Sequence, residues 1–492
     1  MDLRERLRLM RAAGPRRPAA RPEPAPETAG APPERPGAAE AHAQGGSSPE
    51  DCRLGHGGAA APAPARCPEA STGEPRAADA AHLPGSRIAG RLLPTPYGPA
   101  FCVETWYPLD QRRGRVRLAE VLAVPGQGWE RIGRHPLWAD FDPTRAAFFD
   151  TETTGLERGA GTAIFLAGVG RFVGGGFRIR QFFLRDYPEE PAFLQALAAE
   201  LSEASALVTF NGKSFDWPVL TSRLVLQRQR LPEIPHLDLL YPARRLWREV
   251  VASCRLVDLE AAVLGEHRDG DIPGEQIPRL YFEYLRTGAA APLEPVLAHN
   301  RLDILSLVAL AGYLGHAAAD PVAAAPGGVP LTGAELLAMG RWLLELGEPL
   351  AAARALEAAL DRGLPGPYVA AGHRLLAAAY KRLAWYDKAL AHWQLLAQEG
   401  RYSYEACVEL AKYYEHRARD YPRAREVAQA ALERLQRQRL LAGLGEAPDP
   451  RWAREVAELR HRLARLEGKL ARQAGGHSPA GSQRAERESY DR

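Results

Sequence analysis

Four carboxylates in three short motifs limit the folds that this chain can adopt. Asp150 and Glu152 stand in FFDTETTGL, directly after an apolar run. In a strand, residues i and i+2 project from the same face, so the motif predicts two carboxylates on one side of a strand end. Two such charges repel each other, and a bound divalent cation is the usual reason for holding them together. The motif therefore predicts a buried strand that ends at a polar, metal-binding edge.

The second motif, VTFNGKSFDWP, places Asp216 in the first turn of a helix, after a strand that ends at Phe210. The helix dipole favours an acidic residue at that position in any case, which is the purely structural interpretation. Lys213 and the two aromatic residues that flank the aspartate, Phe215 and Trp217, favour a site for a phosphate and a stacked base instead.

The third motif, HNRLDILSL, places His299 and Asp303 four residues apart, on one face of a helix. Its leucines indicate that the helix is largely buried, and a buried carboxylate needs a partner. Arg301 is the ordinary candidate for that partner, and a metal ion is the alternative. Taken together, the three motifs favour one shared metal site.

Oxygen ligands without thiolates suit Mg²⁺ or Mn²⁺. Two such ions about 3.5 to 4 Å apart can clamp the attacking and leaving oxygens of an in-line phosphoryl displacement. The expected chemistry is therefore phosphodiester hydrolysis, with Asp150, Glu152, Asp216 and Asp303 as ligands. His299 is the candidate base that activates the attacking water, because an imidazole titrates close to neutral pH.

The pattern around these motifs predicts a mixed α/β sheet with helices on its faces. Short β-like runs before it predict a small antiparallel element at 86–145, and the sheet domain itself is expected at 146–315. Apolar or alternating runs predict strands at 146–149, 163–173, 177–184 and 207–210, and helices at 189–202, 214–229 and 297–314.

Beyond a linker rich in Ala, Pro and Gly at 316–330, the chain is expected to be helical and repetitive. Three sets of apolar positions recur with periods of 37 and 35 residues, near the 34 of tetratricopeptide repeats. We therefore expect three degenerate units of this kind at 331–436, offering a surface to a protein partner, with a plain helical packing domain as the alternative. The recurring positions are Ala352, Leu356 and Ala359; Ala389, Trp393 and Leu396; and Ala424, Ala428 and Ala431.

Composition assigns the remaining segments. Residues 1–85 are rich in Ala, Pro, Gly and Glu and poor in aromatic and β-branched residues, so we expect a disordered leader there. A C-terminal helix is expected at 437–475 and a disordered tail at 476–492.

Charge, cysteine content and the length of apolar runs limit the possible partners and the cellular compartment of the protein. With 63 basic and 60 acidic residues, the formal charge of +3 gives no whole-chain case for nucleic-acid binding, so that case must come from a site. Five widely spaced cysteines without a CxxC pair argue against a disulfide framework or a zinc ribbon and fit a reducing cytoplasm. No run approaches the roughly 18 apolar residues of a membrane span, so we expect a cytoplasmic protein that does not bind membranes.

The order D-x-E, N-x-x-x-F-D, H-x-x-x-D resembles the DEDD, or DnaQ-like, 3'-5' exonucleases of the ribonuclease H-like superfamily. More narrowly, FFDTETTGL, TAIFLAGVG, VTFNGKSFDWPVL, HLDLL, DIPGEQIP and HNRLDILSL resemble the YprB-type branch over about residues 86–315. The resemblance implies a five-stranded mixed sheet flanked by helices. It also implies hydrolysis from the single-stranded 3' end of DNA or RNA, with two ions held by the four carboxylates. The candidate nucleic-acid contacts are Thr153, Asn211, Lys213, Phe215 and Trp217.

One departure leaves the role of His299 open. The histidine-type exonucleases place histidine five residues before the last aspartate and the tyrosine-type place tyrosine four before, whereas this chain has histidine at the tyrosine spacing. Three roles are therefore open for His299: it positions or activates the attacking water, it contacts a phosphate, or it only packs within the fold. Asp238, between leucines, is expected to be structural, and Asp258 and Asp271 are expected at the surface or in turns.

Two other functions compete with the exonuclease interpretation. One is a catalytically idle ribonuclease H-like scaffold that binds nucleic acid or protein. The other is an endonuclease that acts on hybrids or branched DNA.

Overall fold

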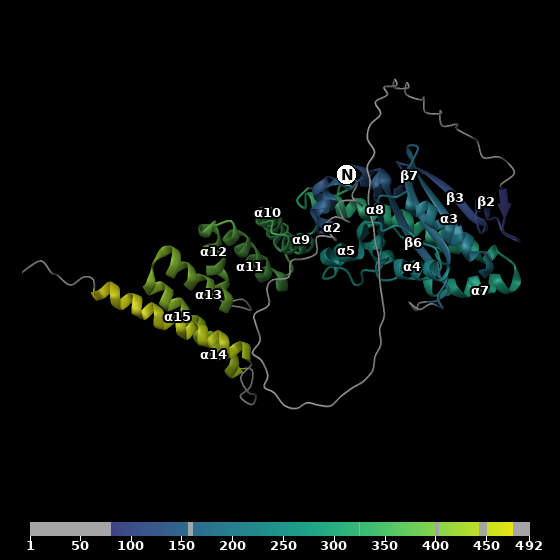
Figure 1. Cartoon of the computed structure of the whole chain (residues 1–492). Helices are drawn as coiled ribbons and strands as arrows, with labels where there is room; N and C mark the ends of the chain where they lie inside the picture. Colours follow the sequence, from purple (N-terminus) through teal and green to yellow (C-terminus); the bar gives the residue numbers. More distant parts are fainter. Residues whose placement is uncertain (1–79, 156–160, 324, 399–402, 442–449, 476–492) are drawn as a thin grey trace, which may run out of the picture. The chain divides into compact units, whose positions relative to one another are not determined.

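The structure is a computed structural model that describes residues 80–155, 161–323, 325–398, 403–441 and 450–475. Most of the predicted leader and the whole of the predicted tail lie outside the described residues. The described chain forms a sheet with helices on both faces, followed by consecutive helices (Figure 1). This agrees with the fold class expected from the sequence.

The sheet is mixed and contains eight strands in the order β1-β2-β3-β8-β7-β6-β9-β10. β6, β9 and β10 run parallel to one another, and every other neighbouring pair is antiparallel. The strands are β1 (Ala80–His82), β2 (Ala89–Thr95), β3 (Gly98–Pro108), β6 (Ala146–Thr153), β7 (Ile164–Val173), β8 (Gly176–Phe183), β9 (Ala206–Thr209) and β10 (His236–Asp238).

The sheet is wider than the five strands that the family resemblance implies. β3 pairs with β8 from Phe101 to Pro108, so β1, β2 and β3 continue the same sheet. Part of the small β element expected at 86–145 is therefore the edge of the main sheet. The short pair β4 (Arg112–Arg113) and β5 (Val116–Arg117) stays separate from it.

Alternation along β6 divides the core into two layers. Ala146 and Phe148 face one side, where α8 (Glu294–Ala319) packs on β6 and β7. Ala147 and Phe149 belong to the opposite layer, in which apolar residues of three other helices are buried. On the first side α8 is accompanied by α2 (Gly126–Gly133) and α5 (Leu240–Trp247); the second side carries α3 (Glu190–Ser202), α4 (Asp216–Leu226) and α7 (Ile277–Thr287).

α8 lies at the centre of the fold. By length and composition it is apolar enough to cross a membrane, but 78% of its most apolar 18-residue window is buried inside the protein. That burial is typical of the core helix of a globular domain. The helix brings the third sequence motif onto the sheet.

The C-terminal region is entirely helical in its described part. All nine recurring positions of the sequence repeat are buried. Gly340 of α9 permits a close approach to α10, because a Cβ atom there would lie 2.4 Å from Leu356 Cγ. The helices are α9 (Gly333–Glu345), α10 (Pro349–Asp361), α11 (Gly366–Arg382), α12 (Tyr386–Gln398), α13 (Ser403–Tyr413), α14 (Tyr421–Leu441) and α15 (Pro450–Gly475).

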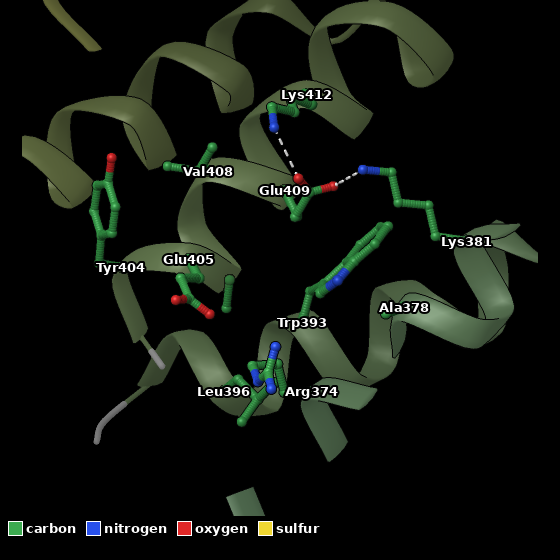
Figure 2. A pocket seen from close by; sticks show the side chains of 11 residues that line it. Arg374, Ala378, Lys381, Trp393, Leu396, Tyr404, Glu405, Val408, Glu409 and Lys412 are labelled. Carbon is green, nitrogen blue, oxygen red and sulfur yellow. Dashed lines mark hydrogen bonds and ion pairs between the residues drawn. The ribbon is translucent and has the colours of Figure 1, made fainter. Parts of the chain in front are cut away.

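A cavity of about 370 Å³ lies among α11, α12 and α13 (Figure 2). Trp393 of α12 supplies apolar surface, while Lys381 of α11 and Lys412 of α13 both pair with Glu409. The cavity therefore combines an apolar wall with a charged rim.

Candidate metal centre

β6 delivers the first two carboxylates to the polar edge of the sheet. Asp150 and Glu152 face the α8 side, and the intervening Thr151 faces the other side. The register of β6 against β7 shifts between Glu152 and Thr153, directly after the carboxylates. Such bulges bend a strand and are frequent beside active sites.

Asp216 reaches the same edge from the opposite layer. Thr151 Oγ1 donates a hydrogen bond of 2.5 Å to Asp216 Oδ1, and Asp216 is only 5% exposed. The turn before it is held by Asp238, whose carboxylate accepts hydrogen bonds from the backbone N–H of Asn211 at 2.8 Å and of Lys213 at 3.0 Å. Asp238 is therefore a structural carboxylate, as its flanking leucines predict.

Asn300 of α8 connects that helix to the first motif. Its Nδ2 donates to Asp150 Oδ2 at 3.0 Å, and its Oδ1 accepts from Gln181 Nε2 at 2.9 Å. Gly168 of β7 makes room for it, because a Cβ atom there would lie 2.4 Å from Asn300 Oδ1. Asn300, Gln181 and Gly168 are not predicted from the sequence as site residues, although Asn300 stands inside the HNRLDILSL motif.

We expect Gly168→Ala to disturb this contact. The added methyl group must displace Asn300 or push α8 from β7, so the free energy of unfolding should fall by about 1–3 kcal/mol. Urea denaturation measures the change. Gly366→Ala is the matched control, because no atom lies within 4 Å of a Cβ built there. Equal effects of the two substitutions would contradict the close approach at Gly168.

His299 projects from α8 between two acidic groups. Its Nδ1 lies 2.8 and 2.9 Å from the two carboxylate oxygens of Asp271, and its Nε2 lies 3.5 Å from Asp303 Oδ2 and 4.0 Å from Glu152 Oε1. One ligand atom each from Glu152, His299 and Asp303 all lie within 4.8 Å of one another. This spacing can accommodate a single cation.

Arg268 is the cation that the protein itself places beside this cluster. Its side chain is 3% exposed, and it donates to Asp303 Oδ1, to Glu260 and, at 3.0 Å, to Asp271 Oδ2. Two expectations from sequence are corrected here. The arginine that pairs with Asp303 is Arg268 and not Arg301, and Asp271 is a partner of His299 instead of a simple surface or turn residue.

Burial raises the pKa values of all four clustered carboxyl groups, and repulsion within the cluster adds to the shift of Asp150 and Glu152. The pKa of Asp150 is raised well above its usual range by burial and then by the charges of Asp303, Asp216 and Glu152. Burial and the charges of Asp303, Asp216 and Asp271 raise the pKa of Glu152 in the same way. Burial raises the pKa of Asp216 to about 6, and it raises that of Asp303 although Arg268 opposes the shift. The cluster therefore either holds protons or binds a cation.

The pKa of Asp271 is shifted in the other direction. Burial alone raises it, but the hydrogen bonds from His299 and Arg268 outweigh burial and hold the pKa below its usual value. Asp271 is therefore an anion over the neutral pH range and can act as an acceptor for a proton on His299 Nδ1.

The raised pKa values make a specific prediction about stability without metal. Such carboxyl groups stabilise the folded state fully below about pH 4, the unfolded pKa, and lose that contribution as the pH rises through the folded-state pKa. For Asp216 that pKa is about 6. We expect the metal-free protein to lose up to about 3 kcal/mol of stability from this group between pH 4 and pH 8.

Urea unfolding at several pH values in EDTA tests this expectation. Asp216→Asn should flatten the decline with rising pH, and Mg²⁺ should reverse it because the ionised carboxylates then have a counter-charge. Identical pH profiles for the wild-type protein and Asp216→Asn would contradict the assigned cluster.

The five candidate nucleic-acid contacts lie in two turns. Thr153 Oγ1 donates to the carbonyl of Gly155 at 2.8 Å and so closes the turn after β6. The other four lie between the end of β9 and the first turn of α4: Asn211 with a φ of 65°, the exposed Lys213, the half-buried Phe215, and Trp217, which contacts His236 edge to face at 5.9 Å.

The fold brings together candidate site residues that are far apart in the sequence. Glu152, His299 and Asp303 lie in direct proximity, and the charges of Asp216 and Asp303 both act on Asp150. A set of carboxylate oxygens fits hard divalent cations such as Mg²⁺ or Mn²⁺.

Comparison with known proteins agrees with this fold. A family model described as the RNase_H superfamily matches residues 147–315, the segment that carries all four carboxylates. The match is confined to the sheet domain of the chain.

A relative narrows the family further. The uncharacterized protein YprB of Bacillus subtilis (strain 168) is 33% identical over 390 residues, which cover 77% of this chain and 89% of that protein. The chain belongs to the YprB family, as the sequence motifs predict.

Proposed function

We propose that this protein is a metal-dependent nuclease that releases nucleotides from the 3' end of single-stranded DNA or RNA. The observation that carries this proposal is the cluster of Asp150, Glu152, Asp216 and Asp303. Burial raises the pKa of each of the four carboxyl groups, and the charges of Asp216 and Asp303 raise the pKa values of Asp150 and Glu152 further. A scaffold gains nothing from mutually repelling buried acids, whereas a divalent cation compensates them.

Each residue of the site has a proposed role. The four carboxylates would hold two Mg²⁺ or Mn²⁺ ions, which would supply positive charge for an in-line displacement at phosphorus. His299 Nε2 faces the carboxylates and accepts the proton of the attacking water. Asp271 is a positioning residue, because an anion beside Nδ1 keeps the proton on that nitrogen and leaves Nε2 free to accept another.

The turns beside the carboxylates are the proposed contacts of the terminal nucleotides. Phe215 and Trp217 bracket Asp216 in the chain and offer faces for base stacking, while the exposed Lys213 suits a phosphate. Thr153 is the last residue of β6, the strand that carries Asp150 and Glu152. Asn211 follows β9, the neighbouring strand. Both are proposed as further contacts of the terminal nucleotides.

Incubation with 5'-labelled oligonucleotides tests the proposal. In Mg²⁺ or Mn²⁺ we expect a ladder that shortens by single nucleotides from the 3' end and disappears in EDTA. Covalently closed circular single strands should stay intact. Cleavage of circles would indicate an endonuclease instead, and a comparison of DNA with RNA identifies the preferred sugar.

Arg268 is the specific observation that favours the second candidate, an idle scaffold. Its guanidinium pairs with Asp303, one of the proposed metal ligands, and neutralises part of the charge of that carboxylate. Asp303 Oδ2 nevertheless faces His299, and among the described residues neither Asp150 nor Asp216 pairs with a cation. A thermal-shift titration with Mn²⁺ separates the candidates, because a nuclease site should be stabilised by the ion and a scaffold should not.

The helical region is the proposed binding site for a protein partner. Its sequence period is close to that of tetratricopeptide repeats, which bind partners on a concave surface. The cavity with Trp393, Lys381 and Lys412 suits a segment that has both apolar and charged side chains (Figure 2).

A further inference from the structure

A basic pocket of about 510 Å³ lies where the sheet domain meets the first helix of the C-terminal region. α5 and α9 form its walls, and Trp247 Nε1 of α5 donates to Glu335 of α9 at 2.8 Å. Tyr241 in the wall is 49% exposed. Five arginines line the pocket: Arg134, Arg244, Arg245, Arg248 and Arg341.

The positive charge of this pocket is only partly compensated. Its two acids are already paired, Glu345 with Arg245 and with Arg134 at 3.5 Å, and Glu249 with Arg341 at 2.9 Å. Within the described chain, Arg244 and Arg248 have no carboxylate partner. Five cations against two anions leave a local charge of +3, which equals the formal charge of the whole chain.

The helix dipole explains only part of this arrangement. Basic residues in the last turn of a helix are stabilising, which accounts for Arg244 and Arg245 at the end of α5. The same effect accounts for Arg134 at the C-cap of α2, but it does not account for Arg341, which precedes the last turn of α9. Arginines from three separate elements therefore converge on one pocket.

A second observation is independent of the charges. Trp342 lines the pocket and is 2% exposed, and its Nε1 is a buried donor without an acceptor in the described structure. Buried donors of this kind are uncommon and call for a partner, which an anion or an ordered water held by one would supply.

The pocket is separate from the carboxylates. Trp247 of α5 packs against Tyr313 of α8 with ring centroids 6.0 Å apart. Tyr313 is ten residues after Asp303, which corresponds to about 15 Å along the helix. With a rise of about 3.4 Å per nucleotide, at least four or five nucleotides cover that distance.

We propose that this pocket binds the phosphate backbone of the nucleic-acid strand upstream of its 3' end. Arg244 and Arg248 contact phosphates, and Tyr241 stacks with a base. This inference rests on the proposed nuclease function and adds a second contact for the same strand. It predicts that long strands bind more tightly than short ones, while the reaction at the carboxylates is the same for both.

Fluorescence anisotropy in EDTA with a labelled 20-nucleotide strand is the first test. The double variant Arg244→Gln/Arg248→Gln should bind about 25-fold more weakly at 0.1 M salt, and the slope of log K against log salt should fall by about 1.4 in magnitude. Arg244→Lys/Arg248→Lys should retain most of the affinity because the charge is kept. The matched control is Arg279→Gln/Arg286→Gln on α7, which removes the same charge from exposed positions on the other face of the sheet.

Hydrolysis of a dinucleotide separates this inference from the proposed function, because so short a substrate cannot reach the pocket. Unchanged dinucleotide hydrolysis together with weakened binding of the long strand supports the pocket. Unaltered binding in the double variant, or an equal loss in the α7 control, overturns it. Preferential binding of polyglutamate over the oligonucleotide also overturns it and points to an acidic protein segment. Absence of hydrolysis in the wild-type protein, with the binding effect intact, overturns only the nuclease assignment.

Discussion

Replacing Asp150 with asparagine is expected to lower metal-dependent hydrolysis by about 10³-fold or more, because the metal clamp contributes several kcal/mol to the lowering of the barrier. The same change should raise the melting temperature of the metal-free protein. Asp150 lies among three other carboxyl groups that raise its pKa, so a neutral amide removes repulsion at nearly constant volume. The side-chain oxygen of the new asparagine can still accept the hydrogen bond from Asn300 Nδ2.

The opposite signs of the two effects make this experiment informative. A merely destabilising mutation lowers activity and melting temperature together, whereas loss of a metal ligand lowers activity and raises the stability of the metal-free form. Stabilisation by Mn²⁺ should shrink in parallel. Asp361→Asn, at an exposed position at the end of α10, serves as the control. Full activity in Asp150→Asn would remove the proposed mechanism.

The second large effect is expected for Asp271→Asn, in which kcat should fall by about 100-fold while KM changes little. Asparagine offers His299 Nδ1 an amide that can donate as well as accept. The imidazole can then carry its proton on Nε2, the nitrogen that faces Glu152 and Asp303, and a protonated Nε2 cannot accept a proton from water.

Two measurements distinguish positioning from a general structural role. NMR of protein labelled with ¹⁵N-histidine should report a change in the tautomer of His299, whose signals are assigned with His299→Gln. Mn²⁺ should stabilise the variant as it stabilises the wild-type protein, because Asp271 is not a proposed ligand. Asp258→Asn is the control, since the partly exposed Asp258 pairs with the exposed Arg255. If the control loses as much activity as Asp271→Asn, or the tautomer is unchanged, the assigned role of Asp271 is wrong.

Much of the fold follows from local patterns in the sequence. The predicted strands and helices of the sheet domain correspond to β6, β7, β8, β9, α3, α4 and α8, with boundaries that differ by a few residues. β6 illustrates one such difference. The apolar run predicts a strand over 146–149, but the strand in the structure continues through both carboxylates to Thr153. Backbone pairing with β7 extends it, and that pairing is not a property of the segment alone.

The number of strands in the sheet was harder to predict from the sequence. β2 and β3 join the sheet because β3 pairs with β8, although about 70 residues separate them. The sequence indicates short strands in this region but not the edge on which they pair. Long-range pairing of this kind depends on which edge remains free after the core strands have assembled.

The sequence by itself determined which candidate site residues share a face of a strand or a helix. Residue spacing places Asp150 with Glu152 and His299 with Asp303 on common faces, because strand and helix periods are fixed by backbone geometry. Only the tertiary structure decided which groups control these residues. Asp271 lies 28 residues from His299, Arg268 lies 35 from Asp303, and Asn300 lies 150 from Asp150. No local period links positions so far apart, so packing of α8 and the loop before α7 against the sheet alone selects the partners.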